Sequence, residues 1–148
     1  MKEKTVYRIL EFNRFYMPAL DLLGNYYLGS EYSAAEARVL FEVYACDGCN
    51  AAHIARTMNL DKSYLSRIIQ HHIKSGYLVR VRSAADFRAF DLHLTEAGKE
   101  RAEELIRKSN EQIGEIIAPL GETECRKLID ALDTITGILK SCGERGML

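Results

Sequence analysis

Residues 50–76, "NAAHIARTMNLDKSYLSRIIQHHIKSG", decide the fold. Asn50 is a typical helix N-cap, and apolar residues follow it at helical spacing. Asp61 caps a second helix, and Gly76 supplies the left-handed residue that ends it. The second helix directs Leu65, Ile68, Ile69 and Ile73 inward. Two helices joined by the short turn "NLD" predict a helix-turn-helix, whose second helix enters the major groove in DNA-binding proteins.

The other face of that second helix is rich in hydrogen-bond donors. With 3.6 residues per turn, the positions between the apolar ones point away from the core. They are side chains of the kind that contact base edges and phosphates: Lys62, Ser63, Tyr64, Ser66, Arg67 and Gln70. The alternative interpretation is an ordinary solvated helix face. Residues 50–90 carry a net charge of +5 and the rest of the chain carries −6, which indicates a polyanionic partner; together with the preceding helix and the turn, this charge favours DNA contact over a solvated face.

A β-hairpin is predicted after the second helix, because residues 77–83 and 88–94 both alternate between apolar and polar. Arg80 and Arg82 lie on the outward side of its first strand. The inward positions are Leu78, Phe90, Leu92 and Leu94. A hairpin in this place makes the lobe a winged helix.

The loop at the tip of this wing is expected to follow a minor groove. Arg88 is the candidate for insertion, because an arginine gains from the concentrated negative potential there. Asp86 is expected to fix the loop, either by pairing with Arg82 or Arg88 or by capping loop amides. An incidental surface pair of little energetic value is the alternative.

The remaining segments are helical. A long first helix is predicted over residues 5–28, with a bend at Pro18. Ser33 begins the next helix, with Glu36 three residues later as a capping box. Its packing face comprises Val39, Leu40, Val43 and Tyr44. The predicted fold class is mainly α with a small β-hairpin wing, a winged helix-turn-helix plus a helical dimerisation region.

Three motifs in order, "LDKSYLSRIIQHHIKSGYLVRVR", "DFR" and "LTEAG", make residues 33–104 resemble the MarR family of bacterial transcription regulators. The resemblance implies one domain over 1–148, with a DNA-binding lobe at about 33–94 and a dimerisation region at about 1–30 and 95–142. It implies a minor-groove role for Arg88 with Asp86 as its partner. It matches major-groove positions to Ser63, Tyr64, Ser66, Arg67 and Gln70.

Two residues depart from the family pattern. Phe87 stands where many relatives have a basic residue, which weakens the expected phosphate contact at the wing tip. His72 stands where an apolar core residue is usual, so the back of the second helix is expected to carry a polar or titratable contact.

A narrower resemblance rests on "FNRFY", "YLGSEYSAAEARVLFEV" and "LDKSYLSRI", which are similar to the regulator half of proteins that fuse a MarR module to a GNAT acetyltransferase. The chain stops at Leu148, too early for that second domain, so no acetyltransferase activity is expected. The sequence also has no phosphate loop, nucleophile elbow or paired carboxylates in an apolar setting. We therefore predict neither enzymatic activity nor a cofactor.

A homodimer is implied by the resemblance, built from the first helix and the last two, at about 95–117 and 122–140. The residues support it independently, because the last helix carries an apolar stripe too long for a small core. The stripe comprises Leu128, Leu132, Ile135, Ile138 and Leu139. A two-fold dimer would read a pseudo-palindromic operator.

A small aromatic or anionic effector is expected by family analogy alone, in a pocket between the dimer helices and the DNA-binding lobe. Its candidate residues are Phe12, Arg14, Tyr16 and His72. The effector would act by changing the spacing between the two recognition helices.

A metal or thiol site is a separate possibility. Cys46, Cys49 and His53 supply three potential zinc ligands, or the cysteine pair forms a redox switch near a helix N-terminus. A lone CxxC without a second ligand pair favours free thiols in a turn. Adjacent His71 and His72 point about 100° apart on a helix, which excludes joint chelation and favours structural roles.

The chain is expected to be cytoplasmic, because it has no apolar run near the ~20 residues that cross a bilayer and no signal-peptide stretch. We predict a ligand-responsive homodimeric repressor that places residues 61–75 in the major groove and 80–90 in the minor groove. The alternatives are a DNA-targeting subunit for a separately encoded acetyltransferase, and a metal- or thiol-sensing variant. The predicted partners are double-stranded DNA, a second copy of the chain and a small-molecule effector.

Overall fold

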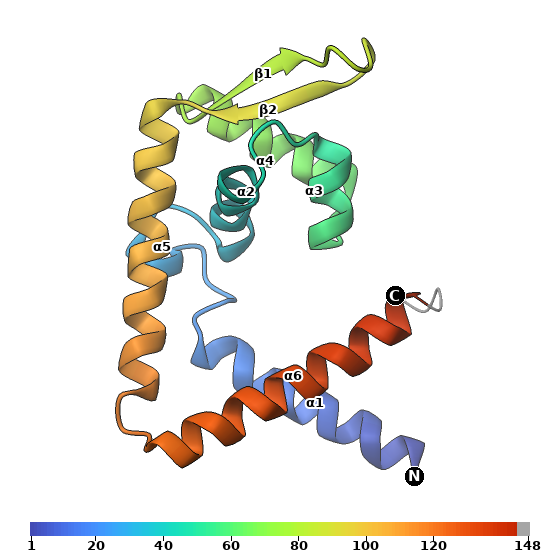
Figure 1. Cartoon of the computed structure of the whole chain (residues 1–148), viewed down its shortest axis with the longest axis vertical. Helices are drawn as coiled ribbons and strands as arrows, with labels where there is room; N and C mark the ends of the chain where they lie inside the picture. Colours follow the sequence, from blue (N-terminus) through green and yellow to red (C-terminus); the bar gives the residue numbers. More distant parts are fainter. Residues whose placement is uncertain (145–148) are drawn as a thin grey trace. The chain divides into compact units, whose positions relative to one another are not determined.

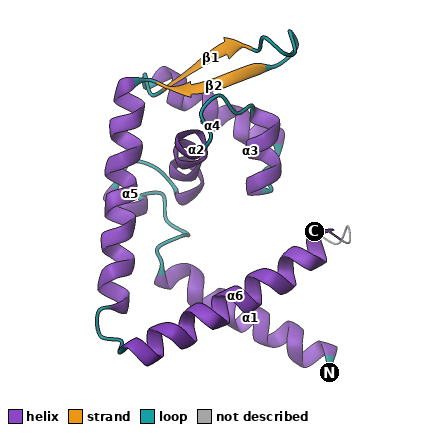
Figure 2. Cartoon of the chain, viewed as in Figure 1, coloured by secondary structure: helices purple, strands orange, loops and turns teal. Residues whose placement is uncertain are grey.

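The computed structural model describes residues 1–144 and shows a mainly helical chain with one β-hairpin, which confirms the predicted fold class (Figures 1 and 2). The elements are α1 (Lys2–Ala19), the short 3-10 helix η1 (Tyr27–Gly29), α2 (Ala34–Ala45), α3 (Ala51–Met58), α4 (Lys62–Lys74), β1 (Leu78–Arg82), β2 (Phe90–Leu94), α5 (Glu96–Ile117) and α6 (Glu122–Glu144). The chain divides into two compact units, residues 1–109 and the part from residue 110 onward. The single domain over 1–148 stays a prediction, and residues 145–148 lie outside the described part.

The helix-turn-helix forms from α3 and α4, with the predicted caps. Asn50 Oδ1 accepts a hydrogen bond from the His53 backbone N–H at 2.8 Å. Asp61 Oδ2 accepts from two backbone N–H groups in the first turn of α4 at 3.0 and 3.1 Å. Asn59 ends α3 in a left-handed conformation with φ of 50°. Local sequence signals therefore set both ends of the turn that orients α4.

The core lies where α2, α3, α4 and the first half of α5 pack against the hairpin. Leu78 and Leu92 are buried, as predicted for the inward side of the wing. The prediction was wrong for Phe90, which is 42% exposed. Phe90 pairs with Arg82 at the end of the hairpin farthest from the core, and the guanidinium lies 5.4 Å from the ring centroid. Tyr44 is also exposed, because its hydroxyl reaches out to Glu103 Oε1 at 3.1 Å.

The first helix is shorter than the predicted 5–28. It ends at Ala19, directly after Pro18, and the chain beyond it turns. Asp21 and Leu28 have φ of 55° and 56°, a conformation that a right-handed helix does not contain. None of the residues of α1 is buried. Its exposed large apolar side chains are Val6, Tyr7, Ile9, Leu10, Phe12, Phe15, Tyr16 and Met17.

The turn between α2 and α3 is attached to the second strand of the wing. The Gly48 N–H donates to Leu92 O at 2.9 Å, and the Leu92 N–H donates to Cys49 O at 2.8 Å. Asp47 Oδ1 lies 2.9 Å from His93 Nδ1. These contacts hold the root of the wing against the start of the helix-turn-helix.

His72 is fully buried behind the recognition helix α4. Its Nε2 lies 2.8 Å from the Glu36 backbone oxygen, and its ring packs edge-on against Tyr32 at 5.0 Å between centroids. Because a carbonyl only accepts, Nε2 carries the proton; Nδ1 has no partner among the described residues. His72 is thus the polar residue that we predicted behind α4.

Acid is expected to destabilise the fold through His72. Burial lowers its pKa below the ordinary 6.5, more than the Glu36 carbonyl and the Glu31 carboxylate raise it, and neighbouring His71 lowers it further. A depressed pKa in the folded state contributes stability above 6.5 that is lost as the pH falls. His72→Gln keeps a neutral donor for the Glu36 carbonyl. It should reduce the slope of unfolding free energy against pH by up to ~1.4 kcal/mol per pH unit, which corresponds to one proton taken up on unfolding.

Urea denaturation between pH 7 and pH 5 measures this slope. The exposed neighbour supplies the control, since His71→Gln keeps the buried His72 ring and should therefore keep most of the slope. Parallel curves for wild type and His72→Gln would show that His72 does not titrate with folding.

The helices α5 and α6 match the two that were predicted for the dimerisation region. Thr95 caps α5, because its Oγ1 accepts from the Gly98 N–H at 3.0 Å. The whole predicted stripe of α6 is exposed, from 42% at Leu128 to 62% at Ile138. None of the helices in residues 1–144 is long and apolar enough to span a membrane.

Candidate nucleic-acid interface

The outward face of α4 is formed by the residues that the sequence predicted. Leu65, Ile68 and Ile69 are buried, so the helical period directs the polar side chains to solvent. The exposed residues are Lys62, Ser63, Tyr64, Ser66, Arg67 and Gln70. The Arg67 guanidinium lies 5.9 Å from the centroid of the Tyr64 ring. This contact holds an arginine near the middle of the exposed face while leaving its donors free for an acceptor.

One contact connects this face to the wing. Arg80 Nη2 on β1 donates to Gln70 Oε1 on α4 at 2.6 Å. The bond fixes the orientation of the Gln70 amide, so that its NH₂ group is the end free to donate. Two side chains predicted to contact DNA separately are therefore coupled to each other.

Backbone hydrogen bonds order the wing loop. The Ser83 N–H donates to Ala89 O, and the Ala89 N–H donates to Asp86 O, both at 3.0 Å. Asp86 Oδ1 accepts from the Arg88 backbone N–H at 2.9 Å. The sequence offered two roles for Asp86, pairing with an arginine or capping loop amides, and this hydrogen bond is a loop-amide cap. Within residues 1–144 its carboxylate forms no ion pair with Arg82 or Arg88.

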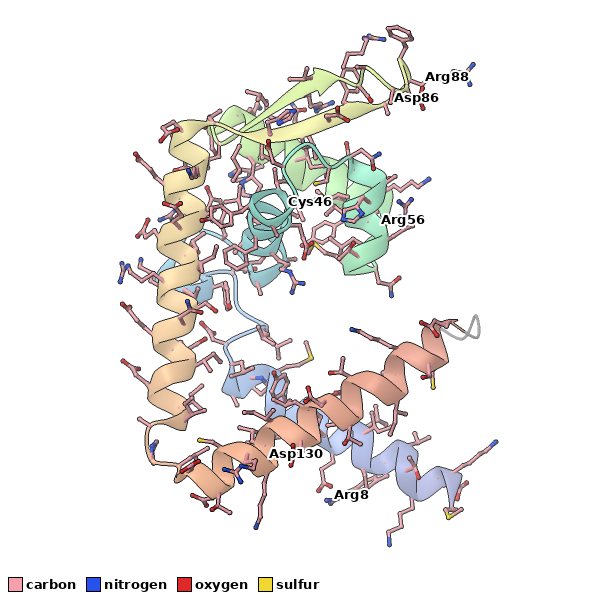
Figure 3. The ribbon with its side chains drawn as sticks, viewed as in Figure 1. Arg8, Cys46, Arg56, Asp86, Arg88 and Asp130 are labelled. Carbon is pink, nitrogen blue, oxygen red and sulfur yellow. The ribbon has the colours of Figure 1, made fainter. Side chains whose placement is uncertain are left out.

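The two arginines near the tip have different roles. Arg82 Nη1 donates to Phe87 O at 2.7 Å, and its guanidinium lies over Phe90, so this side chain holds the wing loop. Arg88 is exposed, and Figure 3 shows it projecting from the tip of the wing beside Asp86. Among the described residues 1–144, the Arg88 guanidinium thus projects to solvent, whereas that of Arg82 is engaged within the protein.

A groove of about 380 Å³ separates the recognition helix from the wing. Leu65, Ile69 and Leu92 contribute to its apolar floor, while Lys62, Arg80 and Arg88 bring three positive charges to its lining from α4, β1 and the wing loop. Charges separated by up to 26 positions in the sequence therefore surround one concave surface. Three positive charges around one concave surface favour a polyanionic ligand.

Two other predicted sites are not assembled. No group of three metal-ligating side chains forms within residues 1–144, so the described structure does not bring Cys46, Cys49 and His53 together as a zinc site. In the predicted effector pocket, Phe12 and Tyr16 stack at 5.1 Å on α1, which also carries exposed Arg14. His72 was wrong as a member of that pocket, because it is completely buried in the core of the winged-helix lobe. The pocket stays a prediction for the other three residues.

Sequence reasoning missed the contacts that hold the root of the wing. Asp47 and His93 are 46 positions apart, and the CxxC motif that contains Asp47 carries no signal for a contact with His93. The short bridge between Asn50 and Asp91 also joins residues that are far apart in sequence. Only a motif that joins both segments could have revealed these pairs, and the chain contains none.

Known proteins share both sequence and structure with the winged-helix lobe. Residues 31–89 match the family model described as MarR family. The chain has the MarR winged-helix fold. The structure of a MarR mutant from E. coli complexed with operator DNA aligns with a TM-score of 0.70 and 18% identity, covering 88% of this chain and 93% of that one. Streptococcus pneumoniae FabT in complex with DNA aligns with a TM-score of 0.71 and 19% identity, covering 95% and 97%.

One curated protein is also similar to this chain in sequence. The uncharacterized HTH-type transcriptional regulator YdgJ of Bacillus subtilis is 26% identical over 100 residues, which is 68% of this chain. The matched region spans 61% of the length of that relative. All the residues that we predicted for DNA contact, from Lys62 to Arg88, lie inside the segment that matches the MarR family model.

Proposed function

We propose that this chain is a DNA-binding transcriptional regulator of the MarR family. One observation carries the proposal: the donor-rich face of α4 and the projecting Arg88 of the wing flank a single groove lined by Lys62, Arg80 and Arg88. A helix face and a hairpin tip on either side of a positive groove fit a major groove and the adjacent minor groove of one duplex. The MarR mutant and FabT, which share this fold, were both solved with DNA.

The contacts divide into those that position the protein and those that read sequence. Arg67 lies on the exposed face of α4 and forms no ion pair with a carboxylate within residues 1–144, which suits bidentate binding to a guanine. Gln70, oriented by Arg80, presents its NH₂ group to a base acceptor. Lys62, Ser63 and Ser66 suit phosphates near the start of α4. Arg88 enters the minor groove, and Asp86 and Arg82 act indirectly by holding the loop that carries it.

The test is fluorescence anisotropy of the purified protein on DNA from upstream of its own gene, titrated at several salt concentrations. Binding should weaken steeply with salt, because each phosphate contact releases a counterion. Weak binding that ignores both sequence and salt would contradict the proposal.

We further propose that the regulator is a homodimer formed through α1, α5 and α6. The support is the large apolar surface that the described chain leaves uncovered on α1 and α6, considered for each helix by itself. A second copy would bury these side chains and place two α4 helices on successive major-groove faces about 34 Å apart.

A charge in the α6 stripe should dissociate this dimer. Leu132 is 42% exposed in the single chain, and Leu132→Lys would bury an unpaired ammonium in the interface. Multi-angle light scattering should give about twice the 16.8 kDa chain mass for the wild type and close to one chain mass for the variant. Asp130→Lys, on the opposite side of α6, is the matched control and should remain dimeric. An unchanged mass for Leu132→Lys would place the interface elsewhere.

We also propose that the protein is a repressor whose DNA binding is controlled by a ligand. Both parts of this proposal rest on the resemblance to the MarR family. An effector bound near Phe12, Arg14 and Tyr16 would alter the distance between the two α4 helices and so release the operator. The resemblance to regulator halves of MarR–GNAT fusions stays a prediction. A stable acetyltransferase complex in a pull-down from native lysate would support recruitment.

A further inference from the structure

Cys46 and Cys49 are held close together by a reverse turn. The Cys49 N–H donates to Cys46 O at 3.1 Å, and Gly48 takes the left-handed φ of 81° inside the turn. A turn of this kind keeps its first and fourth Cα atoms within about 7 Å, and disulfides form at Cα separations of about 4.4–6.8 Å. Both thiols are free. The backbone is therefore already bent to the span that a disulfide requires.

The two thiols differ in their access to solvent. Cys46 is exposed at the end of α2, where Figure 3 labels it, whereas Cys49 is 7% exposed. Burial, followed by the adjacent Cys46, raises the pKa of the Cys49 thiol to about 11. Cys46 is consequently the sulfur that meets an oxidant first, and Cys49 is placed to react second.

The same turn is attached to the wing. Gly48 and Cys49 both exchange backbone hydrogen bonds with Leu92, and Asp47 contacts His93. Leu92 is buried and also lines the groove between α4 and the wing. A covalent bond across the turn therefore acts directly on the segment that sets the wing against the helix-turn-helix.

We propose that Cys46 and Cys49 form a reversible intramolecular disulfide that weakens DNA binding by changing how the turn holds β2. Formation of the disulfide does not depend on the proposed function. Its effect on DNA binding rests on the proposed function. Zinc is not the alternative occupant, because no third ligand lies with the pair within residues 1–144.

The oxidant is a low-molecular-weight disulfide. The Cys46 thiolate attacks one of its sulfurs, its S–S bond breaks, and one small thiolate leaves. Cys49 then loses its proton to solvent, and its sulfur attacks the Cys46 sulfur of the mixed disulfide and expels the second small thiolate. The protein loses two electrons and two protons, and the small disulfide is reduced to two thiols.

Peptide mapping tests the bond. The full chain is purified reduced with a chelator, incubated with oxidised glutathione, blocked with an alkylating agent and digested with trypsin. One peptide between Arg38 and Arg56 holds both cysteines, whereas Cys125 and Cys142 fall in other peptides. It should lose the mass of two hydrogen atoms, take up no alkylating agent, and recover both thiols after reduction. Two alkylated thiols, or glutathione remaining on Cys46, would overturn the proposal.

Anisotropy on the same samples tests the consequence. The oxidised wild type should bind its DNA about tenfold more weakly than the reduced protein. Exposed Cys46→Ser should bind equally well in both conditions, and Cys125→Ser should respond like the wild type. A mapped disulfide with unchanged affinity would overturn the regulatory half. Failure of the reduced wild type to bind any DNA would instead contradict the proposed function, while the mapping still decides whether the disulfide forms.

Discussion

Replacing Gly98 by alanine is expected to destabilise the winged-helix unit by ~3 kcal/mol. A Cβ at this position would overlap Tyr77 O and lie 2.8 Å from Tyr77 C, which are backbone atoms that cannot rotate away. The same Tyr77 oxygen accepts the Thr95 N–H at 3.0 Å, and Thr95 caps α5. The clash therefore forces α5 away from the turn where it begins and breaks the cap as well.

Gly98→Ala should change the free energy of unfolding in the opposite direction from an ordinary glycine-to-alanine substitution in a helix. In an open helical position, glycine to alanine stabilises by up to about 1 kcal/mol. Gly114 supplies that control on the same helix, because a Cβ there meets nothing within 4 Å. Chemical denaturation should show Gly98→Ala strongly destabilised and Gly114→Ala unchanged or slightly stabilised. A neutral Gly98→Ala would mean that α5 does not approach Tyr77 so closely.

Removing Arg67 or Arg88 is expected to have the largest effect on DNA binding. Arg67→Ala should weaken binding to the preferred site by about 1–3 kcal/mol, roughly 10- to 100-fold, and should reduce discrimination between sites, because a bidentate base contact is lost. Arg88→Ala should weaken binding as well, most strongly where the minor groove is narrow. Anisotropy on specific and scrambled duplexes separates the two effects.

A matched charge change controls for simple electrostatics. Arg38 on α2 is exposed, pairs with Glu42 at 2.7 Å and lies outside the groove. Arg38→Ala removes the same unit charge and should leave affinity within about twofold, because an exposed pair has little energetic value. If Arg38→Ala and Arg67→Ala weaken binding equally, α4 does not read the bases.

Arg82 and Arg88 show the limit of the sequence for the site. Their spacing and charge gave both the same predicted role in DNA contact. The hydrogen bond from Arg82 to Phe87 O, together with its packing on Phe90, assigns Arg82 to the wing itself. Whether a guanidinium faces the loop or the solvent depends on the path of the chain between the strands, and a pattern of residue types does not encode that path.

The sequence by itself determined the helix-turn-helix, the wing and the positive charge of the lobe. These follow from interactions between near neighbours: the caps at Asn50 and Asp61, the spacing of apolar residues along α4, and the alternation in the strands. Tertiary structure alone decided the close approach of Gly98 to Tyr77, the coupling of Gln70 to Arg80, and the attachment of the Cys46–Cys49 turn to β2. The physical reason is that these contacts join residues whose distance in space is set by packing of the whole lobe, so no local propensity records them.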